Sequence, residues 1–259
     1  MSDNKKYFIF VGSTIFLQKY NNNLVPLEYM PSEIIKDSCN IIDLGLYSGY
    51  SCVAIELASF GDMPSINGVV SLPLKSSFAA VGDMWFYPLV KSYHLLDWDK
   101  KSKYCSQCGG SIAMRANAFE KVCSSCELSF FPRISPSIIV LIKNENKILL
   151  ARSAHFAAGI YGLIAGFVEP GETLEQAVHR EVYEEVGLKV DNLCYFRSQP
   201  WPFPDSLVIG FTADYAGGNI SFLDGEIAEA AWYGKDDMPG RPSSSVSIAS
   251  DLIDSFILE

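Results

Sequence analysis

The chain has 259 residues, of which 49% are hydrophobic and 13% aromatic. This length predicts one large domain or two ordinary ones, and the composition excludes a disordered protein. The formal net charge of −10 disfavours broad electrostatic binding to nucleic acid, because the phosphate backbone is repelled. A single phosphate-binding site is still compatible with this charge where metal ions reverse the local field.

Membrane and secretion signals are missing from the sequence. No apolar run reaches the roughly eighteen residues of a membrane span, and residues 7–11 are too short for a signal peptide and lack a cleavage-site pattern. We therefore expect a cytoplasmic protein with no membrane partner. Of the seven cysteines, Cys39, Cys52 and Cys194 are scattered, and we expect them to be buried, reduced thiols.

The first 97 residues alternate short apolar runs with turns, which predicts a support or dimerisation domain of α+β type. His94 is the only histidine of this part and has no ligand pattern around it, so we expect a packed or surface residue. Residues 78–96 favour a helix that Pro88 must start or kink. The predicted strands are residues 7–11, 15–17, 41–46, 52–57 and 69–72, with a hairpin loop at residues 21–23.

Residues 98–131 contain two C-x-x-C pairs separated by fourteen residues. This spacing predicts a structural zinc ribbon with one Zn²⁺ ion per chain. Four thiolates close a tetrahedral shell, so the zinc would stabilise the fold rather than take part in catalysis. Disulfides or a redox C-x-x-C pair are the alternatives, and both are disfavoured in a reducing compartment. The predicted ligands are Cys105, Cys108, Cys123 and Cys126.

Residues 132–259 again alternate apolar runs with turn residues. Residues 137–142 and 147–151 flank Asn144-Glu-Asn146 and predict a hairpin of core strands. We expect further strands at residues 163–165, 191–196, 207–215 and 226–232, and a turn at residues 217–219 that leads into residues 220–222. Residues 246–258 favour a final amphipathic helix.

The most informative stretch of the chain runs from Gly166 to Leu188. Thr173 and Gln176 form a capping box, which makes Thr173 the expected N-cap of a helix that begins at the next residue. Gly187 supplies the left-handed stop. Apolar residues at helical spacing define a face to be buried: Leu174, Ala177, Val178, Val182 and Val186.

Three carboxylates, of Glu181, Glu184 and Glu185, crowd the edge of this apolar face. Glu181 and Glu185 are a like-charge pair at i,i+4, which costs a few tenths of a kcal/mol in an isolated helix, and Arg180 relieves Glu184 only in part. A solvated acidic face is the ordinary explanation for such a run. Crowding at a buried edge instead favours a site for a hard divalent cation, Mg²⁺ or Mn²⁺.

These residues resemble the complete Nudix box, the signature of the Nudix hydrolase superfamily. Gly166, five residues, Glu172, seven residues and then the run from Arg180 to Leu188 match every fixed position of that pattern. The resemblance implies an α/β/α sandwich, so the predicted fold class is α+β, with an N-terminal Nudix-like domain and a zinc ribbon ahead of the sandwich. It also implies hydrolysis of a nucleoside diphosphate derivative with divalent metals held by the box glutamates.

A second signature follows the box, in residues 198–206. Prolines at alternate positions predict a rigid extended loop that holds two aromatic rings, and a connector with packed aromatics is the ordinary alternative. The stretch resembles the Ser-Gln-Pro-Trp-Pro-Phe-Pro-x-Ser signature of the NADH pyrophosphatase subfamily. That resemblance implies contacts to a nicotinamide dinucleotide, and it covers nearly the whole chain.

The subfamily pattern implies roles for individual residues. Glu181, Glu184 and Glu185 would be catalytic, with Glu184 and Glu185 as candidates for the base. Phe131 and Phe167 would sandwich the nicotinamide, one from each subunit of a homodimer; position 131 is commonly tyrosine, and Phe131 keeps the stacking face without the hydroxyl. The implied metal ligands are Glu181, Glu184, Glu185, Glu226 and the carbonyl of Ala165. The implied nucleotide contacts are Gln199, Pro200, Trp201, Pro202, Phe203, Pro204, Asp205, Ser206 and Ala249.

The sequence therefore predicts metal-assisted hydrolysis of NADH or NAD to AMP and nicotinamide mononucleotide, and removal of the NAD cap from RNA as the same chemistry on a longer substrate. Another Nudix substrate, such as ADP-ribose, is one alternative, which the proline-aromatic loop argues against. A zinc-ribbon module for nucleic acid with an inactive Nudix fold is another. The intact acidic set argues against it, and the ribbon loop has only Arg115 and Lys121 as cations.

Overall fold

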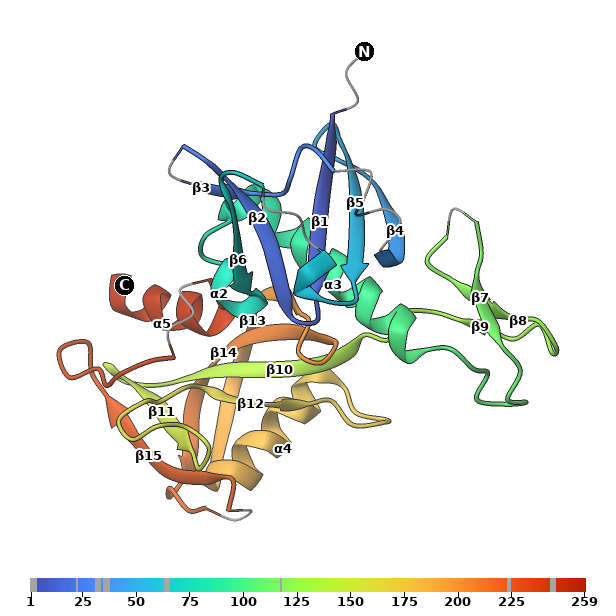
Figure 1. Ribbon diagram of the computed structural model, residues 1–259. Coiled ribbons are helices and arrows are strands. Elements are labelled where there is room, and N and C mark those ends of the chain that lie inside the picture. The colour runs from blue at the N-terminus through green and yellow to red at the C-terminus, as the bar shows by residue number, and fades with distance from the viewer. Residues whose placement is uncertain are drawn as a thin grey trace. The chain divides into compact units, whose positions relative to one another are not determined.

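The computed structural model describes residues 4–21, 23–30, 34, 38–62, 66–116, 118–222, 225–242 and 246–259. The chain divides into two compact units, residues 1–133 and 134–259 (Figure 1). The expected boundary at residue 97 falls within a helix, and the ribbon belongs to the first unit. Within the described residues, no helix is long and apolar enough to span a membrane.

The first unit is built on a six-stranded mixed sheet in the order β3-β2-β1-β5-β4, with β6 paired to β2. The strands β1 and β5 are parallel. The sheet contains β1 (Lys5–Val11), β2 (Thr14–Tyr20), β3 (Asn23–Val25), β4 (Ser38–Tyr47), β5 (Tyr50–Leu57) and β6 (Val69–Pro73), and the short helices are η1 (Phe60–Asp62) and α2 (Leu74–Ser77). The expected strands of this part are confirmed; Asn22, in the expected hairpin loop, lies outside the described residues.

The long helix α3 (Gly82–Lys101) packs its aromatic and aliphatic side chains against this sheet. The ring of Trp85 lies 6.3 Å from that of Phe8, edge to face. Pro88 lies inside α3 rather than at its start. The helix begins at Gly82, four residues after the expected first residue, 78. His94 is a surface residue, as expected, and its Nε2 lies 2.7 Å from the carbonyl oxygen of Arg133.

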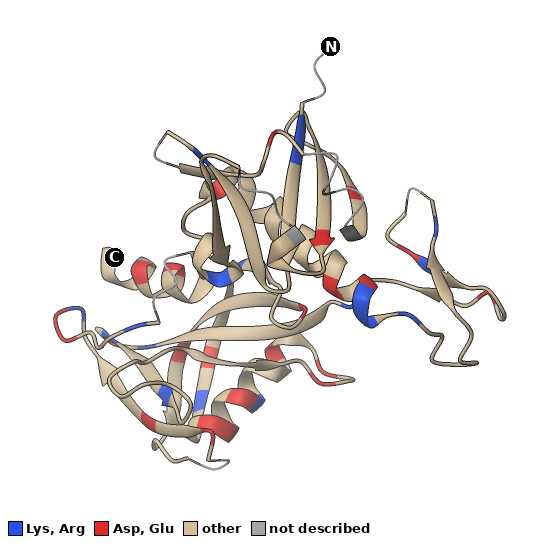
Figure 2. Ribbon diagram, in the orientation of Figure 1, with Lys and Arg blue, Asp and Glu red and all other residues tan. Residues whose placement is uncertain are grey.

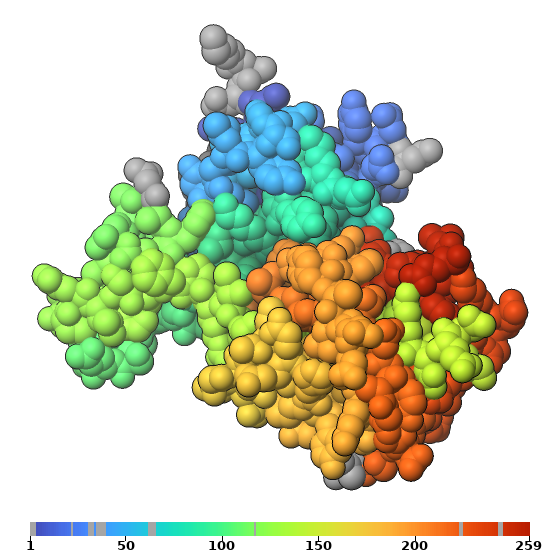
Figure 3. Space-filling model, turned by 180° about the vertical axis from the view of Figure 1, so that it is seen from behind, coloured from blue at the N-terminus to red at the C-terminus, as the bar shows by residue number. Residues whose placement is uncertain are grey.

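The ribbon is a three-stranded sheet of β7 (Ile112–Met114), β8 (Lys121–Cys123) and β9 (Ser129–Phe130). It forms a green lobe beside the blue residues of the first sheet (Figure 3). Lys121 fixes β8 to the end of α3: its buried ammonium group lies 2.7 Å from a carboxylate oxygen of Asp99 and donates to the carbonyl of Ser102. A buried cation stabilises the structure only with such partners.

The second unit has its own six-stranded sheet in the order β13-β14-β10-β11-β15, with β12 paired to β10. One apolar cluster lies between the sheet and α4 (Leu174–Val186), and a second lies between the sheet and α5 (Ile248–Leu258) (Figure 1). The α/β/α sandwich is confirmed. Its strands are β10 (Ser135–Asn144), β11 (Lys147–Ser153), β12 (Ile164–Phe167), β13 (Leu188–Trp201), β14 (Ser206–Gly218) and β15 (Ile227–Tyr233).

Two expectations need correction. Gly217 and Gly218 are the last residues of β14 rather than a turn, and residues 219–222 are not in a strand. Cys52 is buried as expected, but Cys194 is exposed on β13, because it follows a β-bulge between Asp191 and Cys194 that changes which side chains face the core. The side chain of Cys39 lies outside the described residues.

Candidate active site

The helix α4 has the ends that the sequence predicts. Thr173 is its N-cap: the Thr173 hydroxyl accepts the backbone N–H of Gln176, and the Gln176 side chain accepts that of Thr173. Gly187 ends the helix with a φ of 70°, a conformation that costs glycine little. Ala177, Val178, Val182 and Val186 are fully buried against the sheet, and Glu181 and Glu185 lie at the edge of this buried face, with side chains that are largely shielded from solvent.

Arg180 is the centre of a hydrogen-bond network at this edge. Its Nε and Nη2 donate to the two carboxylate oxygens of Glu172, at 2.6 and 2.9 Å. Its Nη1 donates to Glu181 at 2.9 Å and to Glu184 at 3.1 Å, and its Nη2 also donates to the carbonyl of Phe167. One planar guanidinium group thus fixes the loop before α4 and two of the predicted metal ligands.

The carboxylates differ in how readily they ionise. Hydrogen bonds from Arg180 and from the backbone of Glu169 lower the pKa of Glu172 to about 2, so Glu172 is a fixed anion. Burial raises the pKa of Glu181, against the lowering effect of Arg180, and the negative charges of Glu184 and Glu226 raise it further. Glu181 therefore lies in the environment that a bound cation would stabilise most.

Gly166 leaves the space that the Glu181 carboxylate fills. A Cβ atom at position 166 would lie 1.9 Å from Oε1 of Glu181, far inside van der Waals contact. Gly166 is on β12, where it pairs with Ile138 of β10. The invariant glycine of the box pattern is thus required by a close approach between β12 and a predicted metal ligand.

The other predicted ligands lie around this point without forming a preassembled cluster. Glu185 is buried, Glu226 immediately precedes β15, and Ala165 is exposed on β12. Among the residues described, only the four ribbon cysteines form a group whose ligand atoms could hold an ion as they stand. Nη1 of Arg180 lies between the carboxylates of Glu181 and Glu184, and the assignment of Glu181, Glu184 and Glu185 to a metal stays a prediction. Figure 2 shows the acidic residues of α4 in red.

The proline-aromatic stretch is a β-hairpin rather than a loop outside the sheet. The strand β13 continues through Pro200 to Trp201, which pairs with Ser206 of β14, so the loop is shorter than expected. Only residues 202–205 form the turn. The rings of Trp201 and Phe203 pack edge to face with centroids 5.9 Å apart. Pro202 and Ser206 are buried, Asp205 is half-buried and Pro204 is exposed.

Gln199 connects this hairpin to α5. Its side chain is 4% exposed; the amide nitrogen donates to the carbonyl of Val246, and the amide oxygen accepts the N–H of Ile248, both at 2.8 Å. Gln199 therefore positions the first turn of α5, which holds Ala249, and its side chain is committed to this link. The family resemblance implies a nucleotide contact for Gln199, and no local sequence pattern signals this structural role.

The two predicted nicotinamide-stacking residues belong to different units. Phe167, at the end of β12, is 50% exposed beside the Glu172–Arg180 pair, and its carbonyl accepts from Arg180. Phe131 is 65% exposed and belongs to the first unit. Phe167 is thus part of the site around α4. Phe131 is not a residue of the second unit, so that unit alone does not bring the two rings together.

The four ribbon cysteines form a compact group. Their Sγ atoms all lie within 4.8 Å of one another, and the Cys108–Cys123 and Cys108–Cys126 distances are both 3.5 Å. Tetrahedral zinc with bonds of about 2.3 Å holds sulfur atoms roughly 3.8 Å apart, so the donor set fits a zinc ion. Backbone N–H groups of Ser125 and Cys126 lower the pKa of Cys123 to about 6, which favours the thiolate.

Arg180 and Gly166 are the functional residues that the sequence analysis underestimated. Both are fixed positions of the box, but neither was assigned to the site. The spacing of eight residues between Glu172 and Arg180 was the available signal, because the capped helix returns Arg180 to the loop that holds Glu172.

Residues 133–253 match the NUDIX domain family. A crystal structure of a NUDIX hydrolase from Nitrosomonas europaea superposes with a TM-score of 0.51 at 24% identity, covering 61% of this chain and 91% of the other. This structural likeness concerns the fold alone.

The chain belongs to the Nudix family of hydrolases. It is 39% identical over 249 residues to a Chromobacterium violaceum protein named NAD-capped RNA hydrolase NudC, a match that covers 96% of this chain and 90% of the relative. A relative of the same name from Pseudomonas putida is 36% identical, with 93% and 86% covered. A third, from Pseudomonas aeruginosa, is 39% identical over 93% of this chain and 85% of its own length.

Proposed function

We propose that this protein hydrolyses the pyrophosphate bond of NAD and NADH to AMP and nicotinamide mononucleotide, and removes the NAD cap from RNA by the same reaction. The observation that carries the proposal is the likeness to relatives named NAD-capped RNA hydrolase over 96% of this chain. That length includes the box helix and the Trp201–Phe203 hairpin. The net charge of −10 of the protein disfavours tight contacts to the body of an RNA.

The carboxylates of α4 supply the chemistry in this proposal. Glu181, Glu184, Glu185 and Glu226, with the carbonyl of Ala165, would hold Mg²⁺ or Mn²⁺, which neutralises the diphosphate and lowers the pKa of a bound water. Water attacks one phosphorus atom, the bridging P–O bond breaks, and Glu184 or Glu185 accepts the proton of the water. Arg180 would release Glu181 and Glu184 to the metal while keeping its paired bonds to Glu172.

The hairpin and Phe167 supply the recognition of the substrate. Trp201 and Phe203 offer aromatic faces on which a base can stack, and Gln199 keeps this hairpin attached to α5. We further propose that the protein is a cytoplasmic homodimer in which Phe131 reaches the nicotinamide across the dimer interface. In this proposal, residues 1–97 support the fold or the dimer, residues 98–131 form a ribbon that binds Zn²⁺, and residues 132–259 carry out catalysis.

Product analysis tests this function. The purified chain is incubated with NADH, NAD, NAD-capped RNA or ADP-ribose, with Mg²⁺ or Mn²⁺, and the products are separated by chromatography. We expect AMP and the mononucleotide from the dinucleotides, and 5′-monophosphorylated RNA from the capped substrate. Turnover of ADP-ribose alone would contradict the proposal.

The variant Trp201→Ala separates substrate recognition from catalysis. Loss of one stacking contact of about 1–3 kcal/mol should reduce kcat/KM for NADH by roughly 10-fold or more and affect ADP-ribose less. Tyr195→Ala, which removes an exposed ring elsewhere on β13, is the matched control. Equal losses on both substrates would mean that the hairpin has a structural role only.

A further inference from the structure

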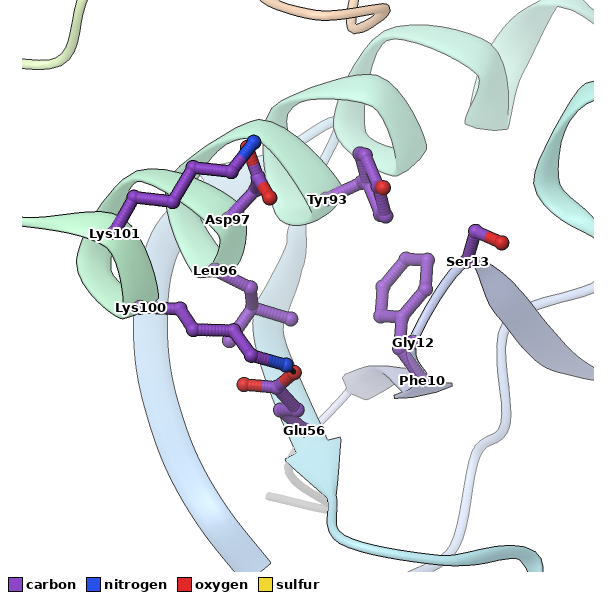
Figure 4. A pocket seen from close by; sticks show the side chains of 9 residues that line it. All are labelled: Phe10, Gly12, Ser13, Glu56, Tyr93, Leu96, Asp97, Lys100 and Lys101. Atoms are coloured by element: carbon purple, nitrogen blue, oxygen red, sulfur yellow. Dashed lines mark hydrogen bonds and ion pairs between the residues drawn. The ribbon is translucent and has the colours of Figure 1, made fainter.

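A cavity of about 280 Å³ lies within the first unit, and none of the residues that line it is assigned to the reaction. It is bounded by the second half of α3, by the ends of the parallel strands β1 and β5, and by the turn at Gly12 and Ser13. Figure 4 shows two ion pairs along one side, Ser13 on the other side, and the rings of Phe10 and Tyr93 between them.

The charged groups of this cavity are arranged by depth. Lys100 Nζ lies 2.7 Å from Oε1 of Glu56, and Lys101 Nζ lies 2.6 Å from Oδ2 of Asp97. The acids are the more buried members, with side chains 13% and 22% exposed, whereas the lysine side chains are 60% and 66% exposed. Negative charge therefore lies inside the cavity and positive charge lies at its rim.

The inner wall is aromatic. Phe10 is buried, and its ring lies 5.8 Å from that of Tyr93, centroid to centroid. Burial, together with the charge of Asp97, raises the pKa of Tyr93, so its hydroxyl remains a hydrogen-bond donor at neutral pH. The faces of aromatic rings attract flat cations, and the two carboxylates reinforce that preference.

This arrangement selects against ligands with one kind of charge. A simple anion meets the carboxylates of Glu56 and Asp97, and a simple cation must pass the two lysines. A zwitterion satisfies both when its cation is a flat ring that enters first and its anionic group stays at the rim. Ammonium groups bind phosphate well, and the attraction of exposed Lys–carboxylate pairs is weak enough to allow a phosphate between them.

We propose that this cavity binds oxidised nicotinamide mononucleotide, a pyridinium ring joined through ribose to a phosphate group. The choice of this zwitterion rests on the proposed function, because that reaction would release it at the second unit. The volume of about 280 Å³ lies just below the range for small-molecule sites, about 300–1,000 Å³, which suits one mononucleotide better than a dinucleotide. AMP, the other product, lacks the ring cation.

Calorimetric titration of the full chain tests the proposal. The parent protein carries Glu181→Gln so that dinucleotides are not turned over. Substitution of both rim lysines, Lys100→Gln with Lys101→Gln, should weaken the binding of oxidised nicotinamide mononucleotide by about tenfold. Lys103→Gln is the matched control, since Lys103 forms the same i,i+4 pair with Asp99 outside the cavity and should leave binding unchanged. Circular dichroism shows whether each variant is folded.

Four further titrations decide the source and the chemistry of the ligand. Binding that depends on the rim lysines should survive Trp201→Ala and should be about tenfold weaker for AMP and for the reduced mononucleotide, whose ring is neutral. Equal binding of AMP would overturn the proposal. So would binding that Trp201→Ala abolishes but the lysine substitutions do not, or NAD binding the cavity as tightly as the mononucleotide.

The failure of this inference is distinguishable from the failure of the proposed function. Hydrolysis is measured on the unsubstituted chain, whereas binding is measured directly on the inactive one. Absence of NAD hydrolysis with lysine-dependent binding would contradict the reaction alone. Hydrolysis without that binding would contradict the cavity proposal alone.

Discussion

The two units of this protein use the same arrangement of strands for different ends. Each has a parallel pair within a mixed sheet, β1 with β5 and β10 with β14, and each packs a helix of three or more turns on that sheet. The helix of the first unit ends in Lys100 and Lys101 and holds buried aromatic rings, whereas that of the second presents Glu181, Glu184 and Glu185. The chemistry of each unit therefore depends on its side chains and not on the scaffold. In the second unit, Gly166 leaves the space that the Glu181 carboxylate occupies beside the sheet.

Removing one carboxylate from α4 should have the largest effect. Glu181→Gln keeps the shape of the side chain and removes the charge that a metal ion requires. We expect kcat/KM to fall by roughly 100-fold or more, which exceeds the effect of losing a residue that only hydrogen-bonds to a metal ligand. The control is Glu175→Gln, on the first turn of the same helix and exposed. Full activity of Glu181→Gln would remove this residue from the metal site.

A methyl group at position 166 tests the close approach directly. Gly166→Ala places a Cβ 1.9 Å from the Glu181 carboxylate and should displace it, with a loss of metal affinity of about 10–100-fold. Gly61→Ala in the first unit, where the nearest atom is 3.5 Å away, should change neither activity nor metal affinity. Metal titrations of activity measure the difference, and equal metal affinities would show that the carboxylate relocates freely.

Loss of the ribbon metal should affect the two units unequally. Cys108→Ser removes one of four ligands and chelation removes the ion itself, and structural zinc contributes directly to folding. Because Lys121 ties β8 to the end of α3, we expect residues 1–133 to lose protection from hydrogen exchange while residues 134–259 keep theirs. Cys194→Ser, at an exposed cysteine of the second unit, is the control. Equal loss in both units would show that the ribbon supports the whole chain.

The smallest expected effect is a dependence of stability on pH. Pairing with Arg180 lowers the pKa of Glu172 from 4.5 to about 2. The folded state therefore binds fewer protons than the unfolded state in this window, so the contribution of the pair is complete above pH 4.5 and is lost as the pH falls towards 2. Chemical denaturation at a series of pH values should show a steeper acid loss for the native chain than for Glu172→Gln. Parallel curves would mean that solvent screens the pair.

Local sequence rules predicted the parts of the site that depend on neighbours in the chain. The capping box at Thr173 and the stop at Gly187 follow from backbone hydrogen bonding alone, and both are confirmed. Contacts between distant segments were beyond such rules. Gln199 bonds to residues 47 and 49 positions later, and Pro200 remains in the β13–β14 ladder because neighbouring strands, not propensity, decide that pairing.

The link between Gln199 and Ile248 has a consequence for the order in which the protein becomes competent during synthesis. All the carboxylates assigned to the metal precede residue 227, but the aromatic hairpin lacks its anchor until α5 has been made and has docked. A nascent chain that stops short of α5 would hold the hydrolytic residues without a fixed platform for the base. Removal of α5 would also uncover the apolar cluster that it forms with the sheet, so the last residues of the chain are required both for the core and for the platform.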